Sequence, residues 1–269
     1  MDQLAETVQF IQQHYTHVPV AGIVLGSGLG NFTTEINIEK EIPYHTIPHF
    51  PVSTVEGHSG NLIFGELRGK KVIVMAGRFH FYEGYTALQV SYPIRVMKLL
   101  GVQTLLLSNA AGGVHPDFNV GDLMLITDHI SLFTINPLLG KNEDALGTRF
   151  PDMSEPYSRQ LISKAKLIGK QAGFDLKEGV YTGVTGPTFE THAEYRLIKA
   201  MGGDAVGMST VQEVIVARHA GMQVFAVSVI TDLGIREEEN IITHEEVLAA
   251  ANEAEPKLTH LITELVGML

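Results

Sequence analysis

The sequence predicts an α/β fold, with one domain over residues 1–269 built on a mixed, mostly parallel central sheet flanked by helices. Short apolar runs typical of buried strands alternate along the chain with longer segments of helical periodicity, which is the pattern of strands joined by helices. In addition, 45% of the 269 residues are hydrophobic, which is enough for one sizeable core. No repeat, low-complexity tract or linker divides the chain.

The chain opens with an amphipathic helix. Leu4, Val8, Ile11 and Tyr15 recur at helical spacing, and we expect Pro19 to close the segment. Strands are then expected where short apolar runs end in small or polar residues, at 20–25, 71–76, 104–107, 123–126, 180–184 and 223–230. Further helices are expected between them and at the end of the chain, at 87–100, 157–172, 193–200, 211–220 and 244–266.

Two features interrupt this alternation. Pro93 lies inside an expected helix and should kink or shorten it, because proline lacks an N–H and clashes with the preceding turn. Residues 131–156 contain three prolines, two glycines and no clear period. We expect a long loop there, and long loops in compact domains are often functional.

Charge and composition exclude several classes of function. The formal net charge is −11 at pH 7 and no Lys/Arg cluster is present, so we expect neither a nucleic-acid nor a membrane partner. No apolar stretch is long enough to span a bilayer, and residues 1–7 do not resemble a secretory signal. The chain has no cysteine, which is compatible with the cytoplasmic location that we expect. It also has no HExxH pattern or convincing set of metal ligands, so we expect no metal.

A glycine-rich loop follows the first expected strand. The run Gly26-Ser27-Gly28-Leu29-Gly30 offers backbone N–H groups and a hydroxyl to an anion. Taken alone, it is better explained as a tight strand-to-helix turn. Asn31 stands where a dinucleotide-binding fingerprint has glycine, and the Lys-Ser or Lys-Thr pair of a P-loop is missing.

A second cluster of polar side chains follows the strand at 71–76. Arg78, His80 and Tyr82 alternate, so they would share one face of an extended segment. Arginine offers a planar set of donors and histidine adds another, which suits an oxyanion site. The alternative is the solvated face of an edge strand, but the flanking glycines favour the site.

Two further segments carry weaker signals. Residues 108–113 place small residues after a strand, either to admit a ligand or simply to turn the chain. Ser209 and Gln212 have the spacing of a capping box before an apolar helix, whose N-terminus would also attract phosphate. The glycine pattern of a serine-hydrolase nucleophile elbow is incomplete around Ser209.

Together, these loops resemble the trimeric purine nucleoside phosphorylases over essentially the whole chain. Seven motifs in order carry the resemblance, namely LGSGLG (25–30), VEGH (55–58), GRFHFYEGY (77–85), SNAAGG (108–113), GPTFET (186–191), VGMST (206–210) and HEEV (244–247). It implies phosphorolysis of purine nucleosides and deoxynucleosides, preferably inosine and guanosine, to the free base and (deoxy)ribose 1-phosphate in purine salvage. Inorganic phosphate would be a co-substrate, with no cofactor.

The resemblance also implies a role for each matched residue. The phosphate site would comprise Ser27, His58, Arg78, His80, Ala110 through its backbone N–H, and Ser209. The ribose would be bound by Tyr82, Tyr181, Met208 and His244, with Phe133 added from a neighbouring subunit of a homotrimer. The base would contact Asn109, Phe189, Glu190, Val206 and Asp232.

One residue departs from the family pattern, because Asp232 replaces the usual asparagine. An ionised aspartate cannot donate to purine O6 or N7. Asp232 must therefore be protonated when it meets a 6-oxopurine, or accept from a 6-amino group, or else it caps a turn and never touches the base. We expect it to face the purine.

Three other functions compete with this one. Methylthioadenosine or adenosine phosphorylase would share the fold and phosphate site, but His244 and Ser209 count against it, whereas Asp232 favours it. A nucleotide-binding oxidoreductase fails at Asn31 and lacks the ribose-binding acid. A catalytically silent nucleoside-binding protein is disfavoured by the joint presence of Arg78 and Glu190 with the rest of the site.

Overall fold

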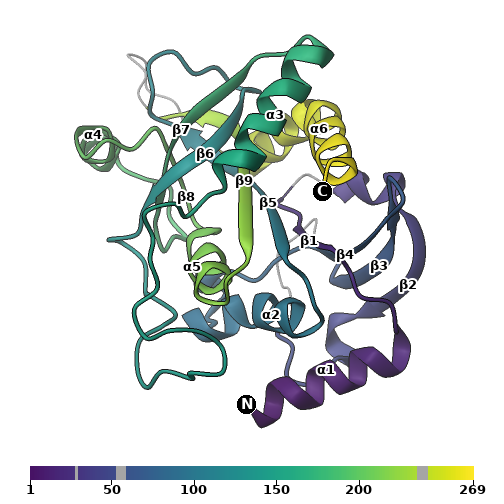
Figure 1. Ribbon diagram of the computed structural model, residues 1–269. Helices are drawn as coiled ribbons and strands as arrows, with labels where there is room; N and C mark the ends of the chain where they lie inside the picture. Colours follow the sequence, from purple (N-terminus) through teal and green to yellow (C-terminus); the bar gives the residue numbers. More distant parts are fainter. Residues whose placement is uncertain (28–29, 53–58, 235–241) are drawn as a thin grey trace.

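A computed structural model describes residues 1–27, 30–52, 59–234 and 242–269 (Figure 1). Its strands run in chain order as β1 (Ala21–Val24), β2 (Asn37–Pro43), β3 (Asn61–Leu67), β4 (Lys70–Ala76), β5 (Thr104–Gly113), β6 (Leu123–Ile130), β7 (Leu176–Gly183), β8 (Ala205–Gly207) and β9 (Gln223–Leu233). The helices are α1 (Asp2–His14), α2 (Ala87–Leu99), α3 (Arg159–Ala172), α4 (His192–Ala200), α5 (Val211–His219) and α6 (His244–Gly267). Three short 3-10 helices are η1 (Gly30–Glu35), η2 (Tyr44–Thr46) and η3 (Phe81–Glu83).

All of these strands join one sheet in the order β2-β3-β4-β1-β5-β8-β7-β6-β9. Because β9 also pairs with β5, strands β5 to β9 close on themselves, and β1 to β4 extend the sheet from β5. Parallel pairs join β1 to β4 and β5, β5 to β9, and β7 to β6 and β8. The remaining pairs are antiparallel, so the mixed sheet is confirmed and parallel pairs predominate only narrowly.

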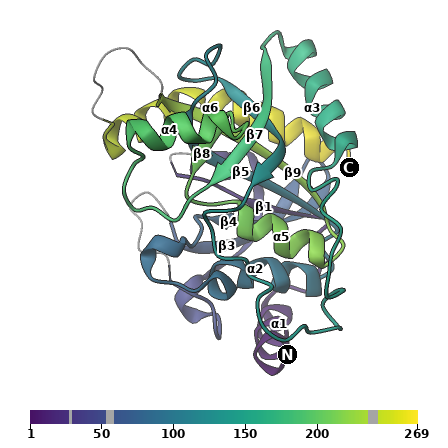
Figure 2. The ribbon, with the colours of Figure 1, turned by 90° about the vertical axis from the view of Figure 1, so that its left-hand side faces the viewer.

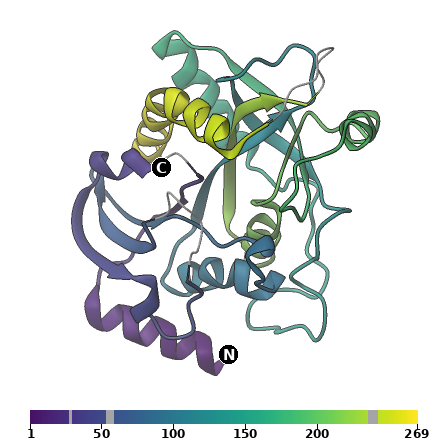
Figure 3. The same ribbon diagram turned by 180° about the vertical axis from the view of Figure 1, so that it is seen from behind.

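Helices cover both faces of this sheet. In Figures 1 and 2, α3 and α6 lie together on one side of the sheet, and α2 and α5 lie on the other with α1 beyond them. Figure 3 shows α4 apart from these pairs, at the end of the molecule where β7 and β8 finish. The buried strands are almost continuously apolar, as expected for strands covered on two faces.

Several sequence predictions were wrong in detail. Residues 108–113 are not a turn but the second half of β5, because small residues there let β5 pair with both β9 and β8. Helix α2 runs on through Pro93 to Leu99, one residue before its expected end at Leu100, so Pro93 does not end the helix. The N-cap of α5 is Thr210, without a side-chain cap, so Ser209 and Gln212 form no capping box.

Three strands were not predicted at all. β2 and β3 form an antiparallel pair at the sheet edge, and the exposed polar residues of β2 hide its pattern from a search for apolar runs. β8 has only three residues. None of the described helices has both the length and the apolar character needed to cross a membrane.

Candidate active site

One pocket lies at the edge of the sheet where the parallel strands β1, β4, β5 and β9 end. Ser27 and Arg78 come from the segments that follow β1 and β4, and Ala110 and Asp232 come from the last residues of β5 and β9 themselves. Ligands in open α/β sheets usually bind at this edge.

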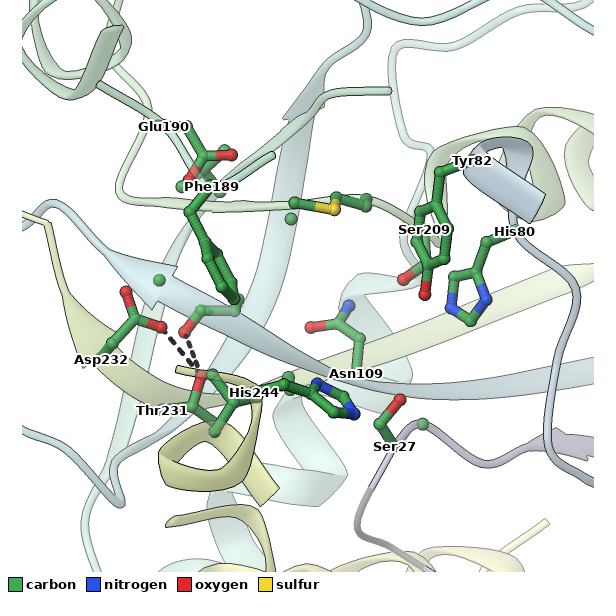
Figure 4. A pocket seen from close by; sticks show the side chains of 18 of the residues that line it. Ser27, His80, Tyr82, Asn109, Phe189, Glu190, Ser209, Thr231, Asp232 and His244 are labelled. Carbon is green, nitrogen blue, oxygen red and sulfur yellow. Dashed lines mark hydrogen bonds between the residues drawn. The ribbon is translucent and has the colours of Figure 1, made fainter. Parts of the chain in front are cut away.

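The pocket brings together most of the residues that the sequence had singled out. Its lining includes Ser27, Arg78, His80, Tyr82, Asn109, Ala110, Phe189, Glu190, Val206, Met208, Ser209, Asp232 and His244. Figure 4 shows two ends: His80, Tyr82 and Ser209 lie on one side, while Phe189, Glu190 and Asp232 lie on the other. His244 and Asn109 lie between them. The pocket is therefore divided into a cationic, hydroxyl-rich end and an aromatic, acidic end.

Arg78 is held by a buried ion pair. Its guanidinium donates to both carboxylate oxygens of Glu213 on α5, from Nη2 at 3.0 Å and from Nε at 3.3 Å. The two side chains are only 1% and 3% exposed. Nη1 also donates to the backbone carbonyl of Ser108 on β5. Arg78 is thus fixed in orientation at the pocket wall, and its charge is partly balanced before any ligand binds.

His80 is oriented by the carboxylate of Glu83, three residues along. Glu83 Oε1 accepts from the His80 backbone N–H at 2.8 Å and lies 2.9 Å from Nδ1. Burial lowers the pKa of His80 despite the opposing effect of Glu83, so the ring is neutral at pH 7. With the proton of Nδ1 directed at Glu83, Nε2 is an acceptor. Tyr82 stacks on this ring at 4.6 Å, and burial raises its pKa to about 12.

Tyr181 lies behind the pocket wall. It is fully buried, and its hydroxyl accepts a hydrogen bond from the backbone N–H of Ser209 at 3.3 Å. Burial raises its pKa to about 12, so the hydroxyl stays protonated. The structure therefore places Tyr181 where it supports Ser209, and the ribose contact that the family resemblance implies for it stays a prediction.

Two carboxyl groups face the acidic end of the pocket. Burial raises the pKa of Glu190, and the nearby negative charge of Asp232 raises it further. Asp232 is itself buried, and its Oδ1 accepts from the Thr231 hydroxyl at 3.1 Å (Figure 4). Thr231 in turn also donates to the Ala111 carbonyl of β5. The end of β9 thereby places Asp232 on the pocket wall, and its contact with the base stays a prediction.

The glycine-rich loop is tied to helix α6. Glu255 is buried on α6, and its carboxylate accepts from Asn31 Nδ2 at 2.7 Å and from the Phe32 backbone N–H at 3.2 Å. Gly26 lies so close to β5 that an added Cβ would stand 2.8 Å from the Asn109 Cα. A larger residue at Gly26 would push Ser27 out of the pocket.

Besides Tyr181, two predicted site residues are not placed on this pocket. His58 falls outside the described residues. Phe133 is 39% exposed in the long loop and lies away from the pocket of its own chain. The loop also exposes Leu132, Ile135, Leu139 and Phe150.

Sequence reasoning missed several residues around the site. Thr231 and Val247 line the pocket, and Glu213 and Thr210 stand directly behind it. The sequence did contain a signal for Glu213. This acidic residue directly precedes the apolar run 214–217 of α5, and an acid that is buried with such a run needs a partner. No group of three or more His, Asp or Glu residues suited to a metal occurs within the described parts of the chain.

Comparisons with known proteins agree with this geometry. A model of the phosphorylase superfamily matches residues 20–267. The chain is 49% identical to purine nucleoside phosphorylase 1 of Geobacillus stearothermophilus, over 98% of this chain and 96% of the relative. It is 47% identical to the purine nucleoside phosphorylase of Rattus norvegicus, over 97% and 92%.

This chain belongs to the purine nucleoside phosphorylase family. Comparison of the fold with solved structures identifies the same family. Two crystal structures of a Schistosoma mansoni purine nucleoside phosphorylase, one in complex with adenosine and one with inosine, superpose with TM-scores of 0.95 and 0.93. They are 43% and 42% identical to this chain, cover all of it, and are themselves covered to 98% and 97%. The sequence-based recognition is thus confirmed.

Proposed function

We propose that this protein is a pentosyltransferase that catalyses the reversible phosphorolysis of purine ribonucleosides and deoxyribonucleosides, preferably inosine and guanosine. The products are the free base and (deoxy)ribose 1-phosphate. The observation that carries the proposal is the division of one pocket into a cationic, hydroxyl-rich end and an aromatic, acidic end. A nucleoside joins a sugar to a flat base, so it fits between an anion site and a base site.

Phosphate would bind at the cationic end as the dianion HPO₄²⁻. Ser27, Ser209 and Arg78 supply donors there, together with the backbone N–H of Ala110. Neutral His80 offers an acceptor at Nε2, which suits the single P–OH of this ion. His58 completes the set that the family resemblance assigns to phosphate.

The reaction needs no covalent nucleophile from the protein. A phosphate oxygen attacks C1′ while the bond from C1′ to N9 breaks, and the electron pair of that bond leaves with the purine. Holding phosphate against the sugar makes the encounter effectively intramolecular. The fixed dianion also faces the positive charge that develops on the sugar. Tyr82, Met208 and His244 would position the ribose, with His244 directed at the 5′-hydroxyl.

The base would lie between Phe189, Val206 and the two carboxyl groups. Glu190 accepts from N1–H and from the 2-amino group of guanine in its ionised form. Asp232, held beside it, donates to N7 when protonated and so neutralises the departing purine. The negative charge of Asp232 contributes to raising the pKa of Glu190, and two carboxyl groups that repel each other in this way favour a state in which one of them is protonated. This arrangement supports 6-oxopurine turnover despite the departure at Asp232.

Phosphate-dependent base release tests the proposal directly. Purified protein should release base from inosine and guanosine only when phosphate is added. Release mainly from adenosine or methylthioadenosine would instead indicate a methylthioadenosine or adenosine phosphorylase, the alternative that Asp232 favours. Absence of release from all four nucleosides would refute phosphorolysis.

The base site is tested by two isosteric variants. Glu190→Gln and Asp232→Asn should change the ratio of kcat/KM among inosine, guanosine and adenosine, while the KM for phosphate stays within about twofold. Arg78→Ala provides the opposite control, because it should raise the KM for phosphate with little change in base preference. Equal losses on every base in the first two variants would contradict the assigned roles.

We further propose a homotrimer that works in cytoplasmic purine salvage. Five large apolar side chains of the 131–156 loop are exposed, and a patch of such side chains usually marks an interface. In a trimer, Phe133 would complete the ribose site of the neighbouring subunit. We also propose that residues 1–269 form one domain, since one main apolar core joins the elements from α1 to α6.

A further inference from the structure

Thr210 occupies an unusual turn beside the pocket. It lies between β8 and α5 with φ 71° and ψ −51°, and the Val211 N–H donates to the Ser209 carbonyl across it at 2.7 Å. This is the strained form of the γ-turn. A β-branched residue in the left-handed region is a true outlier, and glycine would adopt it without cost. The threonine side chain therefore needs a reason beyond the turn itself.

The hydroxyl of Thr210 lies behind the pocket wall, where it contacts both Asn109 and Ser209. Its Oγ1 accepts a hydrogen bond from Asn109 Nδ2 at 2.8 Å and lies 3.1 Å from Ser209 Oγ. Ser209 Oγ also accepts from Arg78 Nη1 at 3.5 Å. Thr210 itself is 1% exposed, so water does not compete for these contacts.

A bound anion gives this chain of hydrogen bonds one direction. The unprotonated oxygens of the anion only accept, so Ser209, facing one of them, must direct its single proton at it. Ser209 Oγ can then only accept from Thr210, and Thr210 must donate its own proton to Ser209. Asn109 Nδ2 can only donate, and it already does so to Thr210. Aligned chains of this kind strengthen one another in a buried environment.

The last group in this series of hydrogen bonds is Asn109 Oδ1, an acceptor without a partner among the described residues. Asn109 is 2% exposed, and its Oδ1 makes no hydrogen bond to any residue that the structure describes. Figure 4 shows the side chain of Asn109 in the pocket between Ser27 and the base-facing residues. A buried carbonyl oxygen left unpaired is costly, so a donor of a bound ligand would satisfy it.

We propose that Thr210 is a positioning residue that couples phosphate binding to nucleoside binding through Ser209 and Asn109. The inference rests on the proposed function, because it takes the anion to be phosphate and the donor to be an N–H or O–H of the nucleoside. Phosphate on Ser209 polarises the Thr210 hydroxyl, which holds the Asn109 amide with Oδ1 toward the nucleoside. Each ligand then raises the affinity for the other by the same factor. One aligned hydrogen bond corresponds to a factor of roughly 3 to 10.

Equilibrium binding measures this coupling without turnover. Sulfate serves as an unreactive tetrahedral dianion, and calorimetry gives the Kd of inosine with and without saturating sulfate. Wild type should bind inosine several-fold more tightly in sulfate. Thr210→Val keeps the branched shape of the side chain but lacks the hydroxyl. Thr210→Gly also lacks the hydroxyl, and it relieves the backbone strain of the turn. Both should lose the sulfate effect, whereas Thr210→Ser should keep it.

A matched control separates coupling from general damage to the core. Thr263 is also a buried threonine, lies on α6 away from the pocket, and its hydroxyl has no partner among the described residues. Thr263→Val should leave the sulfate effect at the wild-type factor. Because Thr210→Gly removes backbone strain rather than adding it, at least one variant without the hydroxyl should fold well enough to measure.

The outcomes distinguish a failure of the proposed coupling from a failure of the proposed function. If wild type shows phosphate-dependent base release but Thr210→Val and Thr210→Gly keep the full sulfate effect, the coupling role is refuted and the proposed function stands. An equal Kd for inosine with and without sulfate in wild type would refute it as well. If wild type neither binds inosine nor releases its base, both proposals fall.

Discussion

Removing the charge of Glu213 should destabilise the protein and, in the same variant, strengthen its binding of phosphate. Glu213→Gln leaves the Arg78 guanidinium buried beside a neutral amide. Breaking a buried pair by neutralising one partner costs about 3–5 kcal/mol. Glutamine retains one oxygen, and so one of the two hydrogen bonds, which puts the expected loss near the lower end of that range.

A loss of about 3 kcal/mol should lower Tm by about 6–12 °C, at about 2–4 °C for each kcal/mol in a chain near this size. Phosphate then becomes the counter-ion that Arg78 lacks. At 100 times its Kd, a ligand that binds only the folded state adds about 2.7 kcal/mol. Saturating phosphate should therefore restore most of the Tm, and the KM for phosphate should fall.

Thermal melts at several phosphate concentrations, together with initial rates, measure both effects. Glu178→Gln is the matched control, because Glu178 forms a 2.6 Å pair with Lys166 but on the surface. Exposed pairs contribute about 0–1 kcal/mol. If Glu213→Gln melts no lower than Glu178→Gln, or if phosphate stabilises both variants equally, then Glu213 does not balance Arg78 and the reasoning is wrong.

Three further predictions concern the acid, the base site and the assembly. Burial raises the pKa of Glu190, so its carboxylate should become protonated at a higher pH than the carboxylate of an exposed glutamate. As the pH is lowered, kcat/KM for inosine should therefore start to decrease at that higher pH. Glu190→Gln should abolish this decrease. Gly112→Ala places a Cβ 2.8 Å from Asp232 Oδ2, so kcat/KM should drop about tenfold with the fold intact by circular dichroism. Phe150→Asp should dissociate the proposed trimer in sedimentation, whereas Leu88→Asp, on exposed α2 surface, should not.

The sequence predicted most of the regular elements because their apolar periods are strong. The two strands β1 and β9 and the helices α3 and α6 were expected within a few residues of their bounds. The edge strand β2 escaped notice because its exposed polar face removes the apolar signal. The ring closed by β5 and β9 also could not be predicted, since pairing between distant strands depends on tertiary contacts that a local pattern does not record.

The pocket was predicted by residue type more successfully than by geometry. Ser27, Arg78 and Asp232 lie far apart in the sequence, and only their shared place at strand ends brings them together. Residues behind the pocket wall were missed. Thr210, for example, ends the VGMST motif but was assigned no role, because its importance comes from a backbone angle that no composition or spacing reveals.

The tie between Glu255 and the glycine-rich loop has a consequence for how the enzyme is made. Helix α6 follows the strands and the other described helices in the sequence, yet it supplies His244 to the pocket and holds Asn31 and Phe32, in the 3-10 helix that follows the glycine-rich loop. During synthesis the first strand and this 3-10 helix emerge long before their anchor. The pocket therefore cannot be complete until α6 has emerged, and a nascent chain that has already built most of its sheet would still be unable to turn over substrate.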